Sequence, residues 1–232
     1  MSFWETFPKQ RLLIEVSLWS ADFTCFGDEI RRMDPYADLY HFDVSDGHFV
    51  PGLLFFADLV SALRPLTDKP FHVHLMATQP LSHIDSFIEA GANLISIHAE
   101  NGPLTPAALQ AIRKKGAGAG MAVGLDTRLE HVMPYLDLID VVILMGTPIG
   151  VKGIEPSHYA FERMRHMQVL ITEAGMVEQV KVEADGGIRH HTVPGLRQNG
   201  ADLIVAGSLA FNARDLDETF TWLHGLPIGA ST

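Results

Sequence analysis

The chain has 232 residues, of which 47% are hydrophobic, and its 28 acidic and 17 basic side chains give a formal net charge of -11. This length and apolar content allow one large core, so we predict a single domain over residues 1–232. The acidic balance argues against a nucleic acid or an acidic membrane surface as partner, although helix N-termini can still bind small anions.

The chain begins with a stretch, residues 1–11, that we treat as an N-terminal extension. It contains Trp4 and Phe7 but also charged residues and a proline, and it lacks the continuous apolar run of a signal peptide or a spanning helix. Cys25 is the only cysteine, so no intrachain disulfide can form. We therefore expect a cytoplasmic protein with no membrane role.

Eight short apolar runs rich in β-branched residues predict strands, and amphipathic segments between them predict helices. The predicted strands are 12–17, 39–43, 71–75, 94–98, 121–125, 141–145, 180–184 and 203–206. The predicted helices include 55–63, 81–90, 106–115, 158–174 and 191–199. Eight β-then-α units of similar length without a linker favour a single (β/α)8 TIM barrel over an open doubly wound sheet.

Polar residues gather at the predicted carboxyl ends of the strands, where barrel enzymes carry their function. These residues are Ser17, His41, Asp43, His74, His98 and Asp185. His41 and Asp43 are two apart on a strand and so share a face. With His74 and Asp185 they form a set of two imidazoles and two carboxylates that suits zinc, manganese or ferrous iron. Strand-end histidines are also common structural residues and Asp-Gly pairs are common turns, so the pattern alone leaves both interpretations open.

Four motifs resemble those of the ribulose-phosphate 3-epimerase family. Residues 41–51, His-Phe-Asp-Val-Ser-Asp-Gly-His-Phe-Val-Pro, are similar to the family signature His-x-Asp-x-Met-Asp-Gly-x-Phe-Val-Pro. Three further motifs follow in the family order: His74-Leu75-Met76, Asp185-Gly186-Gly187-Ile188 and Val205-Ala206-Gly207-Ser208. The resemblance runs from Ser17 to Phe211 and implies a barrel of the ribulose-phosphate-binding type.

The resemblance implies an isomerase that epimerises a phosphorylated ketose at carbon 3 through a 2,3-enediolate. A divalent metal, zinc foremost with manganese, cobalt or iron as alternatives, would be bound by His41, Asp43, His74 and Asp185. A Lewis acid stabilises the developing enediolate, and inversion needs one carboxylate on each face of the substrate, which implies Asp43 and Asp185 as acid and base. The expected substrates are ribulose 5-phosphate and xylulose 5-phosphate, allulose 6-phosphate, or a shorter ketose phosphate.

The residues expected to bind the substrate are Ser17, Met76, Gly146, Gly186, Gly187, Gly207 and Ser208. The glycines and Ser208 that follow the seventh and eighth strands match the phosphate site of many barrels, where close amides and a short helix attract the anion. The resemblance also implies a homo-oligomer.

Two places depart from the family pattern. Ser45 replaces the methionine of the first signature, so one wall of the site is expected to be more polar, with Met76 and Met145 retained. The loop 146–153 keeps its glycines and a proline but lacks the usual Asp, Phe and Gln. Because this loop covers the substrate in the family, its change leaves the identity of the ketose open.

Glu15, His72 and Glu183 each lie two residues before a proposed site residue, on the first, third and seventh strands. Alternate strands fill the same layer of a barrel interior, so these side chains are expected to meet beneath the site. A histidine between two buried glutamates is a natural partner for both. We hypothesise that this layer orients the metal ligands; the alternative is that Glu15 or Glu183 turns outward at a bulge.

Two other functions compete with epimerisation. Related barrels that decarboxylate or condense sugar phosphates use an Asp-x-Lys-x-x-Asp motif, but the matching segment Asp43-Val44-Ser45-Asp46 has no lysine. A non-catalytic sugar-phosphate sensor on the same scaffold would be expected to lose a ligand, whereas all four ligand positions are present.

Overall fold

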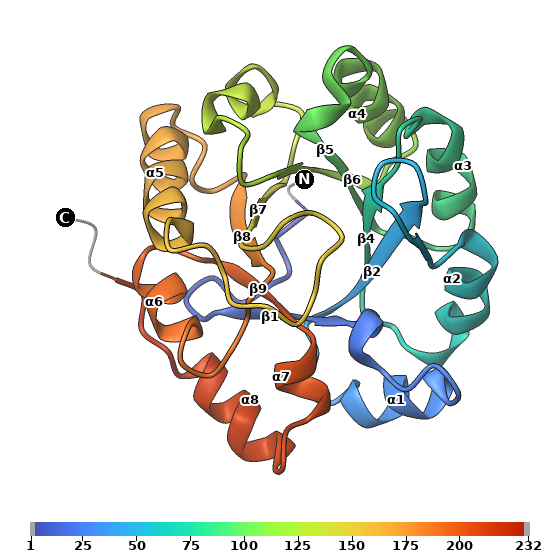
Figure 1. Cartoon of the computed structure of the whole chain (residues 1–232), viewed down its shortest axis with the longest axis vertical. Helices are drawn as coiled ribbons and strands as arrows, with labels where there is room; N and C mark the ends of the chain where they lie inside the picture. Colours follow the sequence, from blue (N-terminus) through green and yellow to red (C-terminus); the bar gives the residue numbers. More distant parts are fainter. Residues whose placement is uncertain (1–2, 230–232) are drawn as a thin grey trace.

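The computed structural model describes residues 3–229 and forms a closed barrel of eight parallel strands inside a ring of helices (Figure 1). Residues 1 and 2 of the predicted extension, and residues 230–232 of the predicted domain, lie outside the described residues. The barrel strands are β1 Leu13–Ser17, β2 Leu39–Asp46, β4 Phe71–Met76, β5 Leu94–His98, β6 Gly118–Val123, β7 Val141–Met145, β8 Lys181–Asp185 and β9 Leu203–Ala206. The predicted TIM barrel is confirmed.

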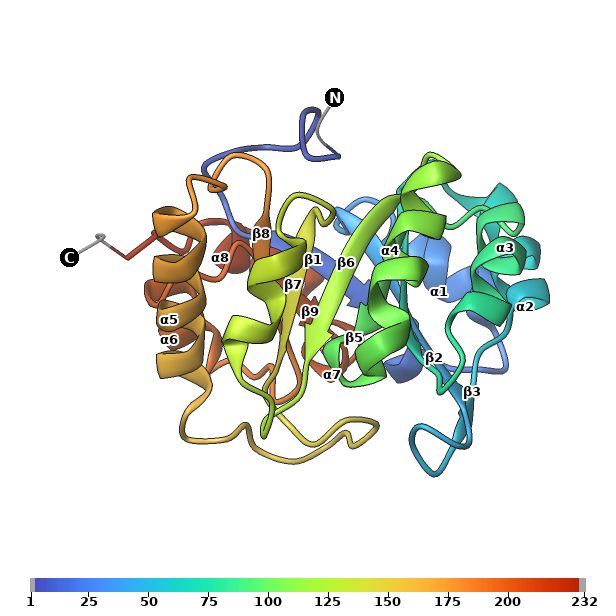
Figure 2. The ribbon, with the colours of Figure 1, turned by 90° about the horizontal axis from the view of Figure 1, so that it is seen from above.

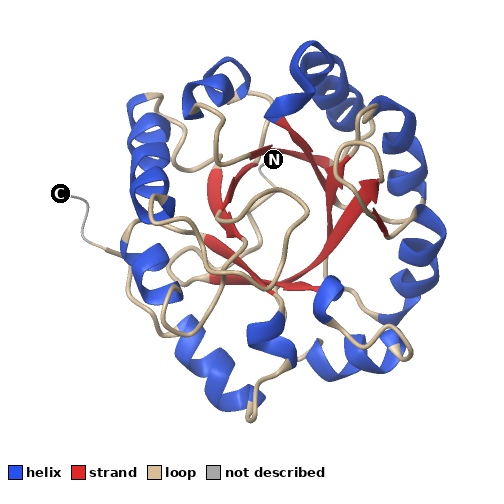
Figure 3. Cartoon of the chain, in the orientation of Figure 1, coloured by secondary structure: helices blue, strands red, loops and turns tan. Residues whose placement is uncertain are grey.

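The barrel closes because β1 pairs with both β2 and β9, while every other barrel strand pairs in parallel with its neighbours. A two-residue strand, β3 (Leu53–Leu54), pairs antiparallel with the end of β2. Figure 3 shows the strands as an inner ring and the helices as an outer one. All eight carboxyl ends therefore open at one mouth, as in other barrels of this kind.

The five predicted helices are confirmed, with ends that differ by at most two residues, and three further α-helices among residues 3–229 were not predicted. The α-helices are α1 Phe26–Met33, α2 Ala57–Leu63, α3 Leu81–Glu89, α4 Thr105–Lys114, α5 Ala160–Glu173, α6 Val193–Gln198, α7 Ser208–Phe211 and α8 Leu216–His224. Short 3-10 segments are η1 Leu18–Ser20, η2 Arg64–Leu66, η3 Ala99–Leu104 and η4 Leu129–Tyr135. No helix among residues 3–229 combines the length and apolarity needed to cross a bilayer.

One strand lies earlier in the sequence than predicted: β6 spans Gly118–Val123, whereas the apolar run suggested 121–125. Glycine has low strand propensity, so the sequence pattern did not reveal the first half of β6. The glycine at 120 has a packing reason, since a Cβ there would overlap Ser96 Oγ and lie 2.5 Å from Val141. The barrel interior thus needs glycine where neighbouring strands fill the space.

The barrel interior changes from apolar at its amino end to polar at its mouth. A floor of buried apolar side chains is formed by Trp4, Leu13, Leu39, Leu94, Val141 and Leu203. Trp4 comes from the N-terminal segment, which crosses that end of the barrel (Figure 2), and its indole Nε1 donates to the carbonyl of Asp140 at 2.6 Å. The next inward positions on β1 and β2 are Glu15 and His41, so the apolar floor gives way to ionisable groups.

Candidate active site

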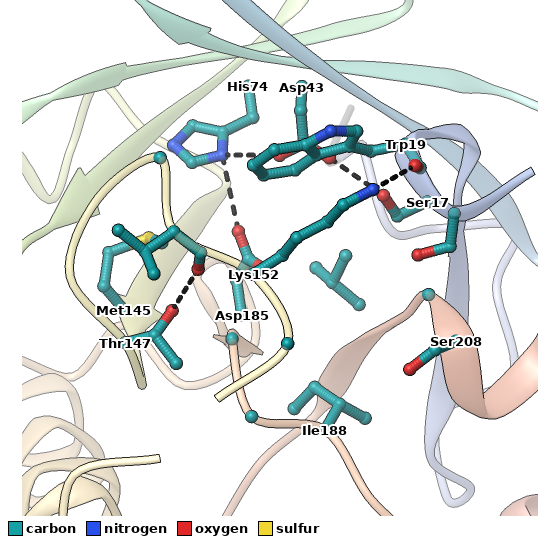
Figure 4. A pocket seen from close by; sticks show the side chains of 18 of the residues that line it. Ser17, Trp19, Asp43, His74, Met145, Thr147, Lys152, Asp185, Ile188 and Ser208 are labelled. Carbon is teal, nitrogen blue, oxygen red and sulfur yellow. Dashed lines mark hydrogen bonds and ion pairs between the residues drawn. The ribbon is translucent and has the colours of Figure 1, made fainter. Parts of the chain in front are cut away.

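A cavity of about 320 Å³ opens at the mouth of the barrel, bounded by the loops that follow β1, β7, β8 and β9 (Figure 4). Nine of the residues predicted to form the site line it: Ser17, Asp43, His74, Met76, Asp185, Gly186, Gly187, Gly207 and Ser208. Met145 also lines it, as expected. The predicted residues that do not line it are His41, which lies beneath, and Gly146.

Four side chains converge at the bottom of the cavity from three strands. Asp43 Oδ1 lies 3.4 Å from both His41 Nε2 and His74 Nδ1. Asp185 Oδ2 lies 3.9 Å from His41 Nε2 and 3.4 Å from His74 Nδ1. Both carboxylates therefore face the same pair of imidazole nitrogens, and the four atoms that could bind a metal ion, one from each side chain, lie within 4.8 Å of one another.

The donor atoms of this cluster are suited to a divalent cation. His41 Nε2 and His74 Nδ1 are among the few buried side-chain nitrogen and oxygen atoms of the described residues that have no hydrogen-bond partner. A buried polar atom without a partner is destabilising, so nitrogens placed in this way fit a site in which a cation is their partner. Two imidazoles and two carboxylates are a common ligand set for zinc, manganese or iron.

The cluster also sets the charge of Asp43, which is 4% exposed. Burial raises the pKa of Asp43, but His41 and His74 outweigh burial and hold that pKa below its ordinary value. Ser17 adds a hydrogen bond, donating from Oγ to Asp43 Oδ2 at 2.8 Å. Asp43 is therefore ionised at neutral pH, the form in which a carboxyl group can accept a proton.

The ring nitrogen of His74 that faces away from the aspartates, Nε2, begins a chain of hydrogen bonds. This nitrogen lies 2.8 Å from His98 Nε2, and His98 Nδ1 lies 3.0 Å from Glu100 Oε2. Glu100 Oε1 in turn accepts from the amide of Gly124 at 2.8 Å. Because Glu100 accepts from His98, one consistent proton arrangement leaves His74 Nδ1 as the lone-pair nitrogen that faces the two aspartates.

The glycines after β8 lie in left-handed backbone conformations that bring the chain close to its neighbours. Gly186 has φ +91° and Gly187 has φ +72°, and a Cβ on Gly187 would lie 2.6 Å from Pro156. Gly146 serves the loop rather than the cavity, since its amide donates to the carbonyl of Asp185 at 2.5 Å and its carbonyl accepts from the amide of Ser157 at 2.7 Å. A glycine is needed at 146 because a Cβ there would overlap the Gly186 carbonyl.

A second ionisable set lies directly beneath the cluster. Glu15, His41, His72 and Glu183 are all fully buried. Glu15 Oε2 lies 2.9 Å from His41 Nδ1 and 2.9 Å from His72 Nδ1, and Glu183 Oε2 lies 3.7 Å from His72 Nδ1. The predicted meeting of Glu15, His72 and Glu183 is confirmed, and neither glutamate turns outward.

Comparison with known proteins places these features in a family. The model of the "Ribulose-phosphate 3 epimerase family" matches residues 13–211. A curated ribulose-phosphate 3-epimerase from Bacillus subtilis is 34% identical over 210 residues, covering 90% of this chain and 96% of the relative. One from Aquifex aeolicus is 33% identical over 94% of this chain and 98% of the relative. This chain belongs to the ribulose-phosphate 3-epimerase family.

Membership confirms the resemblance noted in the sequence and makes the protein an isomerase, an epimerase acting on carbohydrates. Solved structures with lower identity agree on the fold. KGPDC from Streptococcus mutans superimposes with a TM-score of 0.67 at 15% identity, covering 93% of this chain and 100% of that one. Orotidine 5'-phosphate decarboxylase from Pyrococcus horikoshii has a TM-score of 0.65 at 16% identity, covering 91% and 97%. At such identity these likenesses show only the fold.

Three cavity residues, Trp19, Lys152 and Arg189, were not found from the sequence. Lys152, in the altered loop, reaches across the cavity and donates to the carbonyl of Trp19 at 2.8 Å, with its ammonium 4.8 Å from the Trp19 ring centroid (Figure 4). Arg189 lines the cavity and lies 3.4 Å from Ser208 Oγ. Arg189 directly follows the Asp-Gly-Gly-Ile motif, and this position was an available signal; the contact between Lys152 and Trp19 depends on the path of the loop.

The expectation of a more polar wall at Ser45 is wrong. Ser45 does not line the cavity, because its hydroxyl donates to the carbonyl of Gly52 at 2.6 Å and so fixes the turn between β2 and β3. The loop after β7, which passes over the barrel mouth (Figure 1), brings a polar side chain, Lys152, to the cavity.

Proposed function

We propose that this protein inverts carbon 3 of a phosphorylated ketose, with Asp43 and Asp185 as acid and base around a divalent cation. The observation that carries the proposal is the convergence of both carboxylates on His41 Nε2 and His74 Nδ1, at 3.4 to 3.9 Å. The aspartates come from β2 and β8, which are separated in the barrel by β1 and β9. They can therefore approach a bound sugar from different sides.

Each aspartate has one task in either direction of the reaction. One carboxylate removes the proton on carbon 3 from one face, and the other, in its acid form, returns a proton to the opposite face. The cation, zinc by preference with manganese, cobalt or iron as alternatives, would be held by His41, Asp43, His74 and Asp185. When bound, it supplies a Lewis acid that stabilises the negative charge developing on the ketose oxygens.

The phosphate is proposed to bind at the opposite end of the cavity. Gly187, Gly207 and Ser208 line that end, and glycine allows backbone amides to approach an anion closely. Arg189 adds a cationic group beside Ser208. Ribulose 5-phosphate, xylulose 5-phosphate and allulose 6-phosphate are the candidate substrates, and Lys152 is proposed to contact whichever of them is bound.

The test is solvent deuterium exchange at carbon 3, with metal content measured on the same samples. The wild-type protein is expected to incorporate deuterium into one of the candidate ketose phosphates and to lose this activity when a chelator removes the cation. Asp43→Asn and Asp185→Asn are each expected to lower epimerisation per bound cation by about 10²–10⁴-fold.

The two variants serve as controls for each other. Because each retains one carboxylate, each is expected to keep residual exchange with the epimer whose carbon 3 proton faces that carboxylate, and to lose it with the other epimer. A variant that still interconverts the epimers at the wild-type rate would exclude its aspartate from the mechanism. Absence of exchange with every candidate would favour a sugar-phosphate sensor. The expected homo-oligomer remains a prediction, which light scattering can measure.

A further inference from the structure

The fully buried set beneath the cation cluster has no role in the proton transfers described above. Glu15, His41, His72 and Glu183 lie between the apolar floor of the barrel and the cavity. Ionisable side chains in such a position destabilise a fold unless each is closely paired. The two glutamates differ in their distances to the imidazoles: Glu15 is within hydrogen-bond distance and Glu183 is not.

Glu15 makes the short contacts. One of its carboxylate oxygens lies 2.9 Å from His41 Nδ1 and 2.9 Å from His72 Nδ1. An ionised carboxylate only accepts hydrogen bonds, so each of these nitrogens must carry a proton. With Nδ1 of His41 protonated, Nε2 is the nitrogen that can offer a lone pair, and Nε2 is the atom that faces Asp43 and Asp185.

His72, the second partner of Glu15, is fixed by a hydrogen bond from its other ring nitrogen. Ser96 Oγ lies 2.7 Å from His72 Nε2, and because Nδ1 of His72 is the donor to Glu15, Nε2 accepts the serine proton. The space for Ser96 depends on Gly120, where any Cβ would overlap the serine hydroxyl. Ser96, His72, Glu15 and His41 thus form one directed chain that ends at the cation site.

Glu183 differs, although it lies in the same layer. Its oxygens lie 3.7 Å from His41 Nδ1 and from His72 Nδ1, and both are without a hydrogen-bond partner among the described residues. At this distance Glu183 is too far from both imidazoles to fix their protons.

We propose that Glu15 is a positioning residue that holds His41 with its Nδ1 protonated and its Nε2 directed at the divalent cation, and that His72 and Ser96 orient Glu15. This inference rests on the proposed cation site. Carboxylates that accept from a metal-binding histidine orient the ring and raise its affinity for the metal, and removing one typically weakens metal binding by about 10–100-fold. The role is specific to Glu15 and is not shared by Glu183.

The experiment compares Glu15→Gln with Glu183→Gln in the full-length protein. Affinity for zinc is measured by competition with a chromophoric chelator, and zinc stoichiometry by elemental analysis. Glu15→Gln is expected to weaken zinc binding by about 10–100-fold. Glu183→Gln, which removes no hydrogen bond to an imidazole, is expected to change it by less than about threefold.

A second measurement reports the proton directly. In the zinc-loaded protein the Nδ1 proton of His41 should give a slowly exchanging imidazole signal coupled to ¹⁵N, in wild type and in Glu183→Gln alike, and Glu15→Gln should abolish it. If Glu15→Gln does not fold, as judged by circular dichroism, Ser96→Ala carries the test, because it removes the last bond of the chain at a distance from the cation. That variant is expected to weaken zinc binding by about threefold, and an unchanged affinity would contradict the proposal.

Equal losses in the two glutamate variants would overturn the inference, because the role would then not be specific to Glu15. A second equivalent of zinc would also overturn it, since the lower set would then hold a cation in place of the Nδ1 protons. Wild-type protein that binds no zinc or other divalent cation would overturn the proposed function as well. Failure of the positioning role is therefore distinguishable from failure of the site.

Discussion

Replacing Gly187 with alanine tests where the phosphate end of the cavity lies. Gly187 has φ +72°, and a Cβ at this position would lie 2.6 Å from the Cβ, Cδ and N atoms of Pro156, which belongs to the loop over the mouth. Gly175, which follows α5, has φ +70°, and a Cβ added there would meet no heavy atom within 4 Å. The two glycines share a backbone conformation and differ in their surroundings, so Gly175→Ala is the matched control.

The two substitutions should differ by the contact with Pro156. A left-handed conformation at a non-glycine residue is unfavourable by about 1–2 kcal/mol, and this applies to both variants. Overpacking adds about 1–3 kcal/mol when backbone or ring atoms must shift, and this applies only at Gly187. We therefore expect Gly175→Ala to lower the free energy of unfolding by about 1–2 kcal/mol, and Gly187→Ala by about 2–5 kcal/mol.

Urea unfolding measures the stability difference, and inhibition by inorganic phosphate measures the site. Because Gly187 lines the cavity and Gly175 does not, only Gly187→Ala is expected to weaken phosphate inhibition. Equal losses of stability in the two variants would refute the role of the Pro156 contact. A destabilised Gly187→Ala protein with wild-type phosphate affinity would refute the placement of the phosphate beside this glycine.

Two further predictions concern charged residues around the cavity. Lys152→Ala is expected to raise KM for the ketose phosphate about tenfold with a smaller change in kcat, since the ammonium contributes binding rather than proton transfer. Lys114→Ala, on the exposed face of α4, is the control. An unchanged KM in Lys152→Ala would exclude a contact between Lys152 and the substrate. For Glu100, burial raises the pKa, but His98 and Thr127 outweigh burial and lower it to about 2 from the ordinary 4.5. A lowered carboxyl pKa stabilises the fold above about pH 4.5, and this stabilisation is lost as the pH falls toward 2. Because the side chain is 24% exposed, we expect Glu100→Gln to destabilise the protein by about 1–2 kcal/mol at pH 7 and by little at about pH 2.5. Thermal melts of both proteins at the two pH values measure this. A stability difference between wild type and variant that is as large at pH 2.5 as at pH 7 would contradict the prediction.

The barrel could be predicted because its strands are short apolar runs at regular spacing, and every observed barrel strand except β6 begins within one residue of its predicted start. The start of β6 could not, since Gly118 and Gly120 are required by what neighbouring strands place opposite them. The convergence of His41, Asp43, His74 and Asp185 could be predicted because His41 and Asp43 share one face of a strand, and because all strand ends of a barrel meet at one mouth.

Contacts that depend on the paths of loops could not be predicted from the sequence. Nothing in the spacing of Lys152 and Trp19 indicates that the loop after β7 crosses to the segment after β1. His98 and Glu100 are close in sequence, so their contact could be expected. The hydrogen bond between His98 and His74 could not, because it depends on how far β4 and β5 are shifted relative to each other. Such details require the closed barrel and its shear.

The position of the buried layer formed by Glu15, His41, His72 and Glu183 indicates why ionisable rather than apolar residues occupy it. Buried ion pairs are weak contributors to stability, and apolar side chains of similar volume would fill the space beneath the site at least as well. The apolar floor formed by Leu13 and its neighbours shows that this barrel does pack in that way one layer below. Glu15 and His72 interrupt the apolar packing where they can reach His41, the proposed metal ligand that lies deepest. Stability alone does not account for that placement, whereas a requirement to hold one imidazole in a defined orientation does.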